Sequence, residues 1–200
     1  MIDTFVTKAA DWDSPDKVKM TQKFVAELLL HIQPLPSWKA LEIGTGTGLV
    51  GLQIEPLVGK IVLEDTSESM LAVLKQKLNV DSKVELLHGE VFDYKQQDLD
   101  FIFSCMAFHH ITEIEKTLQH LASITKTGAL VAIGDLVSED GSFHSFEPMP
   151  HNGFDTAILS EQFRKAGFDV KLVKIYHVIS RTVESITTNY EQFILIAERT

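Results

Sequence analysis

Residues 39–51, with the sequence KALEIGTGTGLVG, constrain the fold of this 200-residue chain more than any other segment. A short apolar run contains one acid, Glu42, and leads into glycines at positions 44, 46 and 48. Glycine lets the backbone turn tightly and approach a ligand where any Cβ would collide. An apolar run, such a loop and then a helical pattern are typical of a strand–loop–helix unit. The segment predicts a nucleotide-like cofactor at the end of a buried strand.

The glycines alone leave two classes of cofactor open. Gly46, Gly48 and Gly51 satisfy the GxGxxG fingerprint of dinucleotide sites, which would indicate an NAD-dependent oxidoreductase. Glu42 argues against that alternative, because its carboxylate would repel a diphosphate. The same charge would attract a cofactor that carries an ammonium and a sulfonium group, and it therefore favours S-adenosylmethionine.

With this acid followed by GxGxG, the chain resembles the class I S-adenosylmethionine-dependent methyltransferases. Three later segments match the family's further motifs in order. The first, KIVLED, ends in Asp65, which the resemblance assigns to the ribose, with Glu64 as the fallback. The second, VELLHGEV, supplies Glu90 and Val91 for the adenine edge. The third, DFIFSCMAFHHI, has Ser104 in the usual small polar position. The resemblance implies that the cofactor-binding residues are Glu42, Gly44, Thr45, Gly46, Gly48, Asp65, Thr66, Met70, Glu90, Val91 and Ser104.

Methyl transfer is an in-line displacement, so a base is needed only when the acceptor atom carries a proton. The family has no universal catalytic residue, and the catalytic residues of this chain stay open. His110 and His151 are weak candidates for a base, because neutral imidazole works near pH 7; His109 and Asp135 are further possibilities. Acids and histidines between residues 135 and 151 are ligand types for a metal ion, but their spacing fits no standard pattern, and we expect no metal.

The net charge of −10 argues against a nucleic-acid partner, which would need a basic surface. A basic cluster at residues 164–174 is more simply a solvated face. The sequence has no apolar run long enough to cross a bilayer and no leader pattern at its start, so we expect no membrane association. Cys105 is its single cysteine, and together these features favour a cytoplasmic location. We expect a small-molecule acceptor, leave the oligomeric state open, and keep a non-catalytic cofactor-binding module as a second alternative.

Strand and helix patterns alternate along the chain, which predicts an α/β fold with a mostly parallel sheet covered on both faces. Ser14 and Pro15 mark the start of a first helix that ends before Pro34, and Ser160 is expected to cap a late helix that ends at Gly167. The expected strands are 39–43, 60–64, 84–87, 100–105, 128–135, 169–180 and 191–198, and the expected helices between them are 48–56, 67–78, 113–125 and 160–166.

The last two strands follow each other without a helix and should form a hairpin. This matches the reversed seventh strand of the family and implies a Rossmann-like sheet of order 3-2-1-4-5-7-6. We expect one methyltransferase domain over residues 1–200. Its expected parts are an N-terminal helical cap (1–33), a cofactor-binding core (39–135), a substrate loop (136–159) and a C-terminal helix with the hairpin (160–200). Residues 5–12 and 108–112 are further candidates for the walls of the acceptor site.

Overall fold

The computed structural model describes residue 3, residues 5–183 and residues 185–200. Met1, Ile2 and Thr4, which belong to the expected N-terminal cap, lie outside the described residues. The strands are β1 (Lys39–Ile43), β2 (Lys60–Asp65), β3 (Val84–His88), β4 (Leu99–Cys105), β5 (Thr125–Leu136), β6 (Phe168–Val183) and β7 (Ile186–Arg199). The α-helices are α1 (Pro15–His31), α2 (Gly51–Ile54), α3 (Glu68–Lys77), α4 (Ile114–Ile124) and α5 (Thr156–Lys165).

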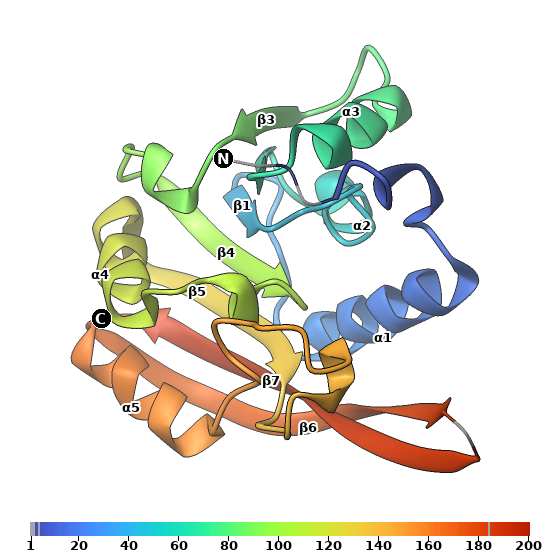
Figure 1. Ribbon diagram of the computed structural model, residues 1–200. Coiled ribbons are helices and arrows are strands. Elements are labelled where there is room, and N and C mark those ends of the chain that lie inside the picture. Colours follow the sequence, from blue (N-terminus) through green and yellow to red (C-terminus); the bar gives the residue numbers. More distant parts are fainter. Residues whose placement is uncertain (1–2, 4, 184) are drawn as a thin grey trace.

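The seven strands form one sheet in the order β3-β2-β1-β4-β5-β7-β6 (Figure 1). The strands β1 to β5 pair in parallel, whereas β7 runs antiparallel to both β5 and β6. The predicted α/β class, strand order and terminal hairpin are confirmed. The sheet order reverses between β1 and β4, and in open α/β sheets ligands bind at such a reversal, at the carboxyl ends of the strands.

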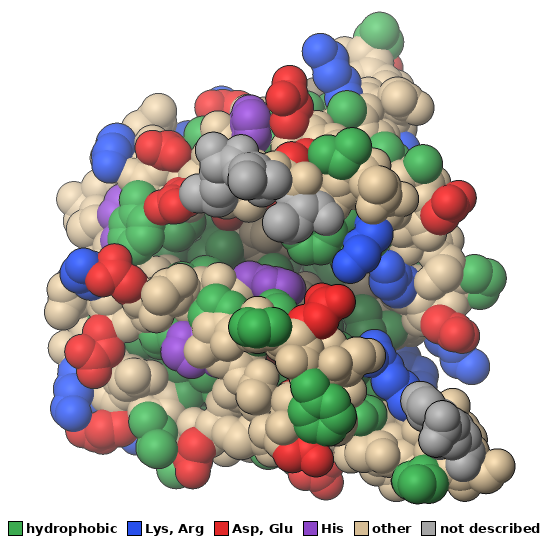
Figure 2. All heavy atoms as spheres, in the orientation of Figure 1, with side chains coloured by type: hydrophobic (Ala, Val, Ile, Leu, Met, Phe, Trp, Pro, Cys, Tyr) green, Lys and Arg blue, Asp and Glu red, His purple; other side chains and the backbone are tan. Residues whose placement is uncertain are grey.

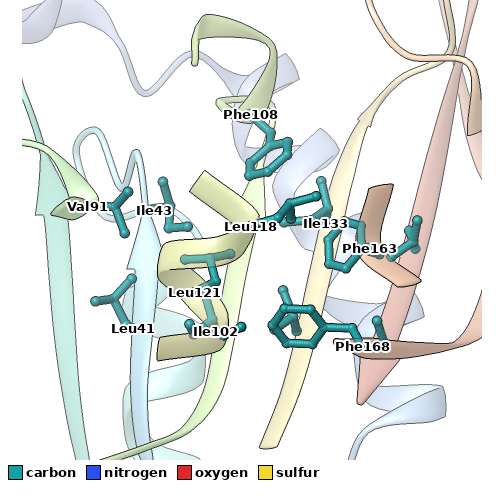
Figure 3. Packing of buried hydrophobic residues seen from close by; sticks show 14 of the residues in the cluster. Leu41, Ile43, Val91, Ile102, Phe108, Leu118, Leu121, Ile133, Phe163 and Phe168 are labelled. Carbon is teal, nitrogen blue, oxygen red and sulfur yellow. The ribbon is translucent and has the colours of Figure 1, made fainter. Parts of the chain in front are cut away.

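Each face of the sheet carries its own apolar core, because successive residues of a strand point to opposite faces. On one face, α4 and α5 pack on the side chains of alternate strand residues such as Leu41, Ile102 and Ile133 (Figure 3). On the other face, α1, α2 and α3 pack on the strand residues that alternate with these, such as Ala40 and Phe103. The alternation assigns every residue at a strand end to one of the two faces.

The N-terminal helix begins as the sequence predicts. Ser14 is the N-cap of α1, and its hydroxyl accepts a hydrogen bond from the backbone N–H of Lys17. Phe24 is completely buried against Gly134 of β5 and Tyr176 of β6. The helix therefore lies across the sheet near the reversed strand.

Two expected helices differ from the structure. The helix expected at 48–56 is only the four-residue α2, followed by a 3-10 turn at Glu55–Leu57, because Pro56 has no N–H to continue the helix. The prediction that Ser160 caps the last helix is wrong. Asp155 caps α5 by accepting bonds from Ala157 and Ile158, and Ser160 lies inside the helix. The helix consequently begins inside the segment that we expected to be a substrate loop.

The hairpin of β6 and β7 is longer than expected, with strands of 16 and 14 residues. Its outer part extends past the rest of the sheet (Figure 1). Pairing with β5 uses only the second half of β7, from Gln192 onward. The first half of β7 pairs with β6 alone, and most of its residues are exposed because no helix covers it.

Candidate functional site

The predicted cofactor-binding residues meet at the carboxyl ends of β1 to β4. The glycine loop, residues 44–48, follows β1 and crosses the end of β2. Its backbone N–H groups bond to the acids there: Gly44 to Glu64 at 3.2 Å and Gly46 to Asp65 at 2.6 Å. The two motifs that the sequence supplied separately thus form one structural unit.

Glu42 is almost completely buried beneath the glycine loop. Its carboxylate accepts a 2.5 Å hydrogen bond from the hydroxyl of Thr45. Burial, with a smaller contribution from the neighbouring carboxylate of Asp65, raises the pKa of Glu42 to about 8, although the hydrogen bond from Thr45 opposes the rise. Glu42 therefore binds a proton near neutral pH unless a positive charge comes close to it.

Glu64 and Asp65 occupy the last two positions of β2 and point to opposite faces of the sheet. Glu64 is buried, and burial followed by the charge of Asp65 raises its pKa well above the ordinary value. Asp65 is partly accessible and also accepts a bond from the backbone N–H of Ser67, but burial still raises its pKa. Three carboxyl groups thus crowd one loop, and their mutual repulsion would be relieved by a bound cation.

Gly46 differs from the other glycines of the loop in what surrounds it. A Cβ at Gly44 or at Gly48 would lie 2.4 Å from a protein carbon, that of Ala107 or Leu74 respectively, so packing of the protein itself excludes a side chain. A Cβ at Gly46 would meet only the indole nitrogen of Trp12, at 3.7 Å, although the backbone there has a φ of +55°. The space above Gly46 is therefore left free by the fold.

The segment before α1 lies across this loop. Asp3 accepts hydrogen bonds from the hydroxyl of Ser67 and the backbone N–H of Ser69, at the start of α3. Farther along, Asp13 accepts bonds from the hydroxyl of Thr47 and the ammonium of Lys77. The N-terminal segment thus forms an outer wall of the site above the glycine loop.

The remaining predicted residues lie around the same strand ends in different environments. Thr66 and Glu90 are exposed, in the turns after β2 and β3. Met70 is buried in α3 and Val91 in the core under α4, so their contact surface already packs on protein. Ser104 is buried and donates a 3.0 Å bond to the carbonyl of Ile43, which ties β4 to the start of the glycine loop.

A cluster of histidines lies beside the loop that follows β4. His109 donates from Nδ1 to Asp135 of β5 over 2.7 Å, and both side chains are buried. His144, from the 3-10 turn Ser142–His144, places its Nε2 3.1 Å from Nε2 of His109. The ring of His110 stacks on His109 with centroids 4.3 Å apart. The structure therefore joins His109, Asp135 and His144, whereas the sequence reasoning put His110 and His151 first.

The two weak candidates have other surroundings. His110 contacts the ring of Phe5 in the N-terminal segment, and the protein around it, with its neighbouring imidazoles, lowers its pKa to about 4. His151 lines an open groove of about 570 Å³ between the starts of α4 and α5, outside the crevice of the glycine loop. Figure 2 shows histidine side chains in a hollow near the middle of one face, a position suited to contact with a ligand.

Among the described residues, no group of three or more histidine, cysteine, aspartate or glutamate side chains is arranged to hold a metal ion. The same residues include no helix with both the length and the apolar character needed to cross a membrane.

The fold is Rossmann-like, and the chain is similar to methyltransferases. A family model described as a methyltransferase domain matches residues 40–128. An uncharacterized methyltransferase of Staphylococcus carnosus is 28% identical over 121 residues, which cover 58% of this chain and 56% of the relative. A demethylmenaquinone methyltransferase of Bacillus cereus is 32% identical over 108 residues, covering 48% of this chain and 44% of the relative. The chain thus spans only about half the length of these relatives.

Solved structures resemble the whole fold. An S-adenosylmethionine-dependent methyltransferase from Aquifex aeolicus superposes with a TM-score of 0.71 at 23% identity, covering 98% of both chains. A chain in the complex of the Haloferax volcanii Trm112 methyltransferase activator with a methyltransferase superposes with a TM-score of 0.82 at 18% identity, covering 99% of this chain and 98% of that one. With the family match, these findings show that the chain is similar to methyltransferases in sequence over part of its length and in its fold along almost all of it.

Proposed function

We propose that this chain transfers a methyl group from S-adenosylmethionine to a small-molecule acceptor. The observation that carries the proposal is the cluster of Glu42, Glu64 and Asp65 around a glycine loop that leaves free space above Gly46. A diphosphate would add negative charge beside three carboxyl groups, whereas the ammonium and sulfonium groups of S-adenosylmethionine would favour their ionised forms. The charge of the site supports S-adenosylmethionine over a dinucleotide.

In this proposal the chain's own residues hold the cofactor by its parts. Asp65 accepts hydrogen bonds from the ribose, the backbone of the loop at Gly46 approaches the cofactor closely, and Glu42 supplies a negative charge for its ammonium end. The exposed Thr66 and Glu90 border the adenine, the buried Met70 and Val91 support the wall behind them, and Ser104 holds β4 against the loop. When bound, S-adenosylmethionine supplies an electrophilic methyl group. The N-terminal segment and the loop after β4 then exclude water and position the acceptor.

Net charge and the names of relatives support the acceptor class. The net charge of −10 disfavours RNA or DNA, and the names of relatives such as the Bacillus cereus enzyme indicate quinone-type small molecules for those proteins. A single domain and a cytoplasmic location belong to the same proposal, the latter supported by the lone Cys105.

Transfer of label tests the proposal. The purified chain is incubated with methyl-labelled S-adenosylmethionine and a cell extract, which is then separated into small molecules, RNA and protein. We expect label in the small-molecule fraction, and none there with a Gly46→Val variant. Label in RNA or protein would contradict the acceptor class. Binding of the cofactor without transfer to any fraction would favour the non-catalytic module.

A further inference from the structure

The pairing of His109 with Asp135 has the geometry of an acid–base dyad. The Asp135 carboxylate accepts three N–H donors: Nδ1 and the backbone N–H of His109, at 2.7 and 3.0 Å, and the backbone N–H of Leu136, at 2.7 Å. All three partners are N–H groups, so the carboxylate oxygens of Asp135 are the acceptors in these bonds. Asp135 therefore fixes a proton on Nδ1 of His109 and leaves the lone pair on its Nε2.

His144 completes a line of three groups. Its Nε2 lies 3.1 Å from Nε2 of His109, and since the latter carries a lone pair, His144 is the donor in this bond. Nδ1 of His144 then carries the free lone pair. Within the described part of the chain it makes no hydrogen bond, and the His144 side chain is only partly buried while His109 is 1% exposed. The outer end of the line is thus the end that a ligand can reach.

This outer end lies on the cofactor side of the molecule. His144 neighbours the ring of His110, with centroids 5.8 Å apart, and His110 contacts Phe5. Phe5 in turn packs against Trp12, whose indole nitrogen is the nearest protein atom to the space above Gly46. A continuous series of contacts therefore connects the histidines with the place assigned to the cofactor.

We propose that Asp135, His109 and His144 form a proton relay that deprotonates the methyl acceptor, and that this acceptor is an aromatic hydroxyl compound such as a phenol or hydroquinone. The inference rests on the proposed function and deepens it. As the acceptor oxygen bonds to the methyl carbon, the carbon–sulfur bond breaks and leaves its electron pair on sulfur. The acceptor's hydroxyl proton goes to Nδ1 of His144, and the proton on Nε2 passes to His109. The resulting imidazolium is stabilised by the buried carboxylate of Asp135, and the proton returns to water after product release.

The chemistry of the base selects the acceptor class. Carboxylic acids are already ionised at neutral pH and need no base, whereas aliphatic alcohols are too weakly acidic for imidazole. Phenols, with a pKa near about 10, lie within its range, as do thiols near about 8.5. The ring of Phe143 packs edge-on against His144, and Phe5 packs in the same way against His110. Phe143 is buried, so the partly accessible ring beside the histidines is that of Phe5, which favours a flat phenolic acceptor over a small thiol.

Charged neighbours set the pH range of the relay. Burial lowers the pKa of His144, and His109 and Arg181 lower it further, while Glu139 and Asp135 act in the opposite direction. His110 also faces the relay, and its own pKa is lowered to about 4. His144 is therefore neutral, and able to accept a proton, at neutral pH.

Histidine NMR tests the relay without any cofactor. In the ¹⁵N-labelled full chain, we expect the resonances of His109 and His144 to move together with one midpoint as the pH falls, while His109 keeps its Nδ1 proton. An Asp135→Asn variant should lower that midpoint by about one pH unit or more, with exposed His31 unchanged as the internal control. Independent midpoints for the two rings, or no effect of Asp135→Asn in a folded variant, would overturn the relay.

Kinetics test the acceptor class with 1,4-naphthohydroquinone under anaerobic conditions. We expect His144→Gln to lower kcat at least about 100-fold without changing S-adenosylmethionine affinity, and added imidazole to restore part of the rate to His144→Ala. His31→Gln should behave as wild type. An unaffected His144→Gln rate overturns the relay, and a wild-type chain that binds S-adenosylmethionine but methylates neither this compound nor catechol overturns the acceptor class. A chain that fails to bind S-adenosylmethionine refutes the proposed function itself, while the NMR result still decides whether the relay exists.

Discussion

Asp65, at the end of β2, accepts a 2.6 Å hydrogen bond from the backbone N–H of Gly46 in the loop after β1. The bond connects the acid assigned to the ribose with the one glycine of the loop that the protein's own packing does not require. The free space and the ribose acceptor therefore lie side by side. In our proposal the cofactor occupies the position that these two residues define.

Replacing Asp65 by Ala should weaken S-adenosylmethionine binding by about 1 to 3 kcal/mol, because hydrogen bonds to a charged acceptor are lost. Calorimetric titration measures the affinity, and the thermal midpoint of the free protein checks the fold. Asp81→Ala, in an exposed turn, is the matched control and should bind as wild type. Unchanged affinity of the Asp65 variant would refute the ribose assignment and direct attention to Glu64.

Gly46→Val should abolish cofactor binding, because the side chain would fill the space above the loop. The φ of +55° adds strain, so some loss of stability is expected as well. Gly48→Ala is the informative comparison, since its Cβ would lie 2.4 Å from Leu74 and the damage should appear first as a lower thermal midpoint. Normal binding by a folded Gly46→Val variant would mean that the loop does not approach the ligand.

Binding of S-adenosylmethionine should release protons at pH 7. Burial raises the pKa of Glu42 to about 8, so this group is largely protonated in the free protein, and a nearby cation would favour its ionised form. Calorimetry in buffers with different ionisation enthalpies measures the number of protons released, which we expect to approach one. Glu42→Gln should reduce both the release and the affinity. Equal proton release by wild type and variant would exclude Glu42 as its source.

The stability of the free protein should also report on Glu42. Because the folded-state pKa is raised above 4.5, the folded protein binds more protons than the unfolded chain between about pH 4.5 and 8. This group therefore makes the protein less stable as the pH rises through that window, by up to about 1.4 kcal/mol per pH unit, and Glu64 and Asp65 act in the same direction. Denaturant unfolding of Glu42→Gln should show a shallower decline; a slope equal to wild type would contradict the assignment.

The alternating strand and helix patterns were sufficient to predict the α/β class and the terminal hairpin, whereas the strand order followed from the resemblance to the methyltransferase family. The predicted caps and ends of helices were less accurate, for example where two residues could each cap the same helix. Ser160 and Asp155 are both capping types, and the cap is Asp155 because the helix begins at Thr156, four residues before the expected start. Likewise, Pro56 shortened the helix expected after the glycine loop.

The cofactor motifs are local in sequence and could therefore be located before the structure was known. The histidine cluster could not, because its partners are far apart along the chain: His109 is 26 residues from Asp135 and 35 from His144. The HH pair indicated that a histidine stood after β4, but nothing in the sequence distinguished His109 from His110. Only the packing of β5 and of the turn Ser142–His144 shows that His109, and not His110, bonds to Asp135 and His144.

The most direct test of the central claim is calorimetric titration of the purified chain with S-adenosylmethionine, S-adenosylhomocysteine and NADH in parallel. Three crowded carboxyl groups at the glycine loop predict that the first two bind and that NADH does not. Binding of NADH alone would contradict the account and assign the glycine loop to a dinucleotide.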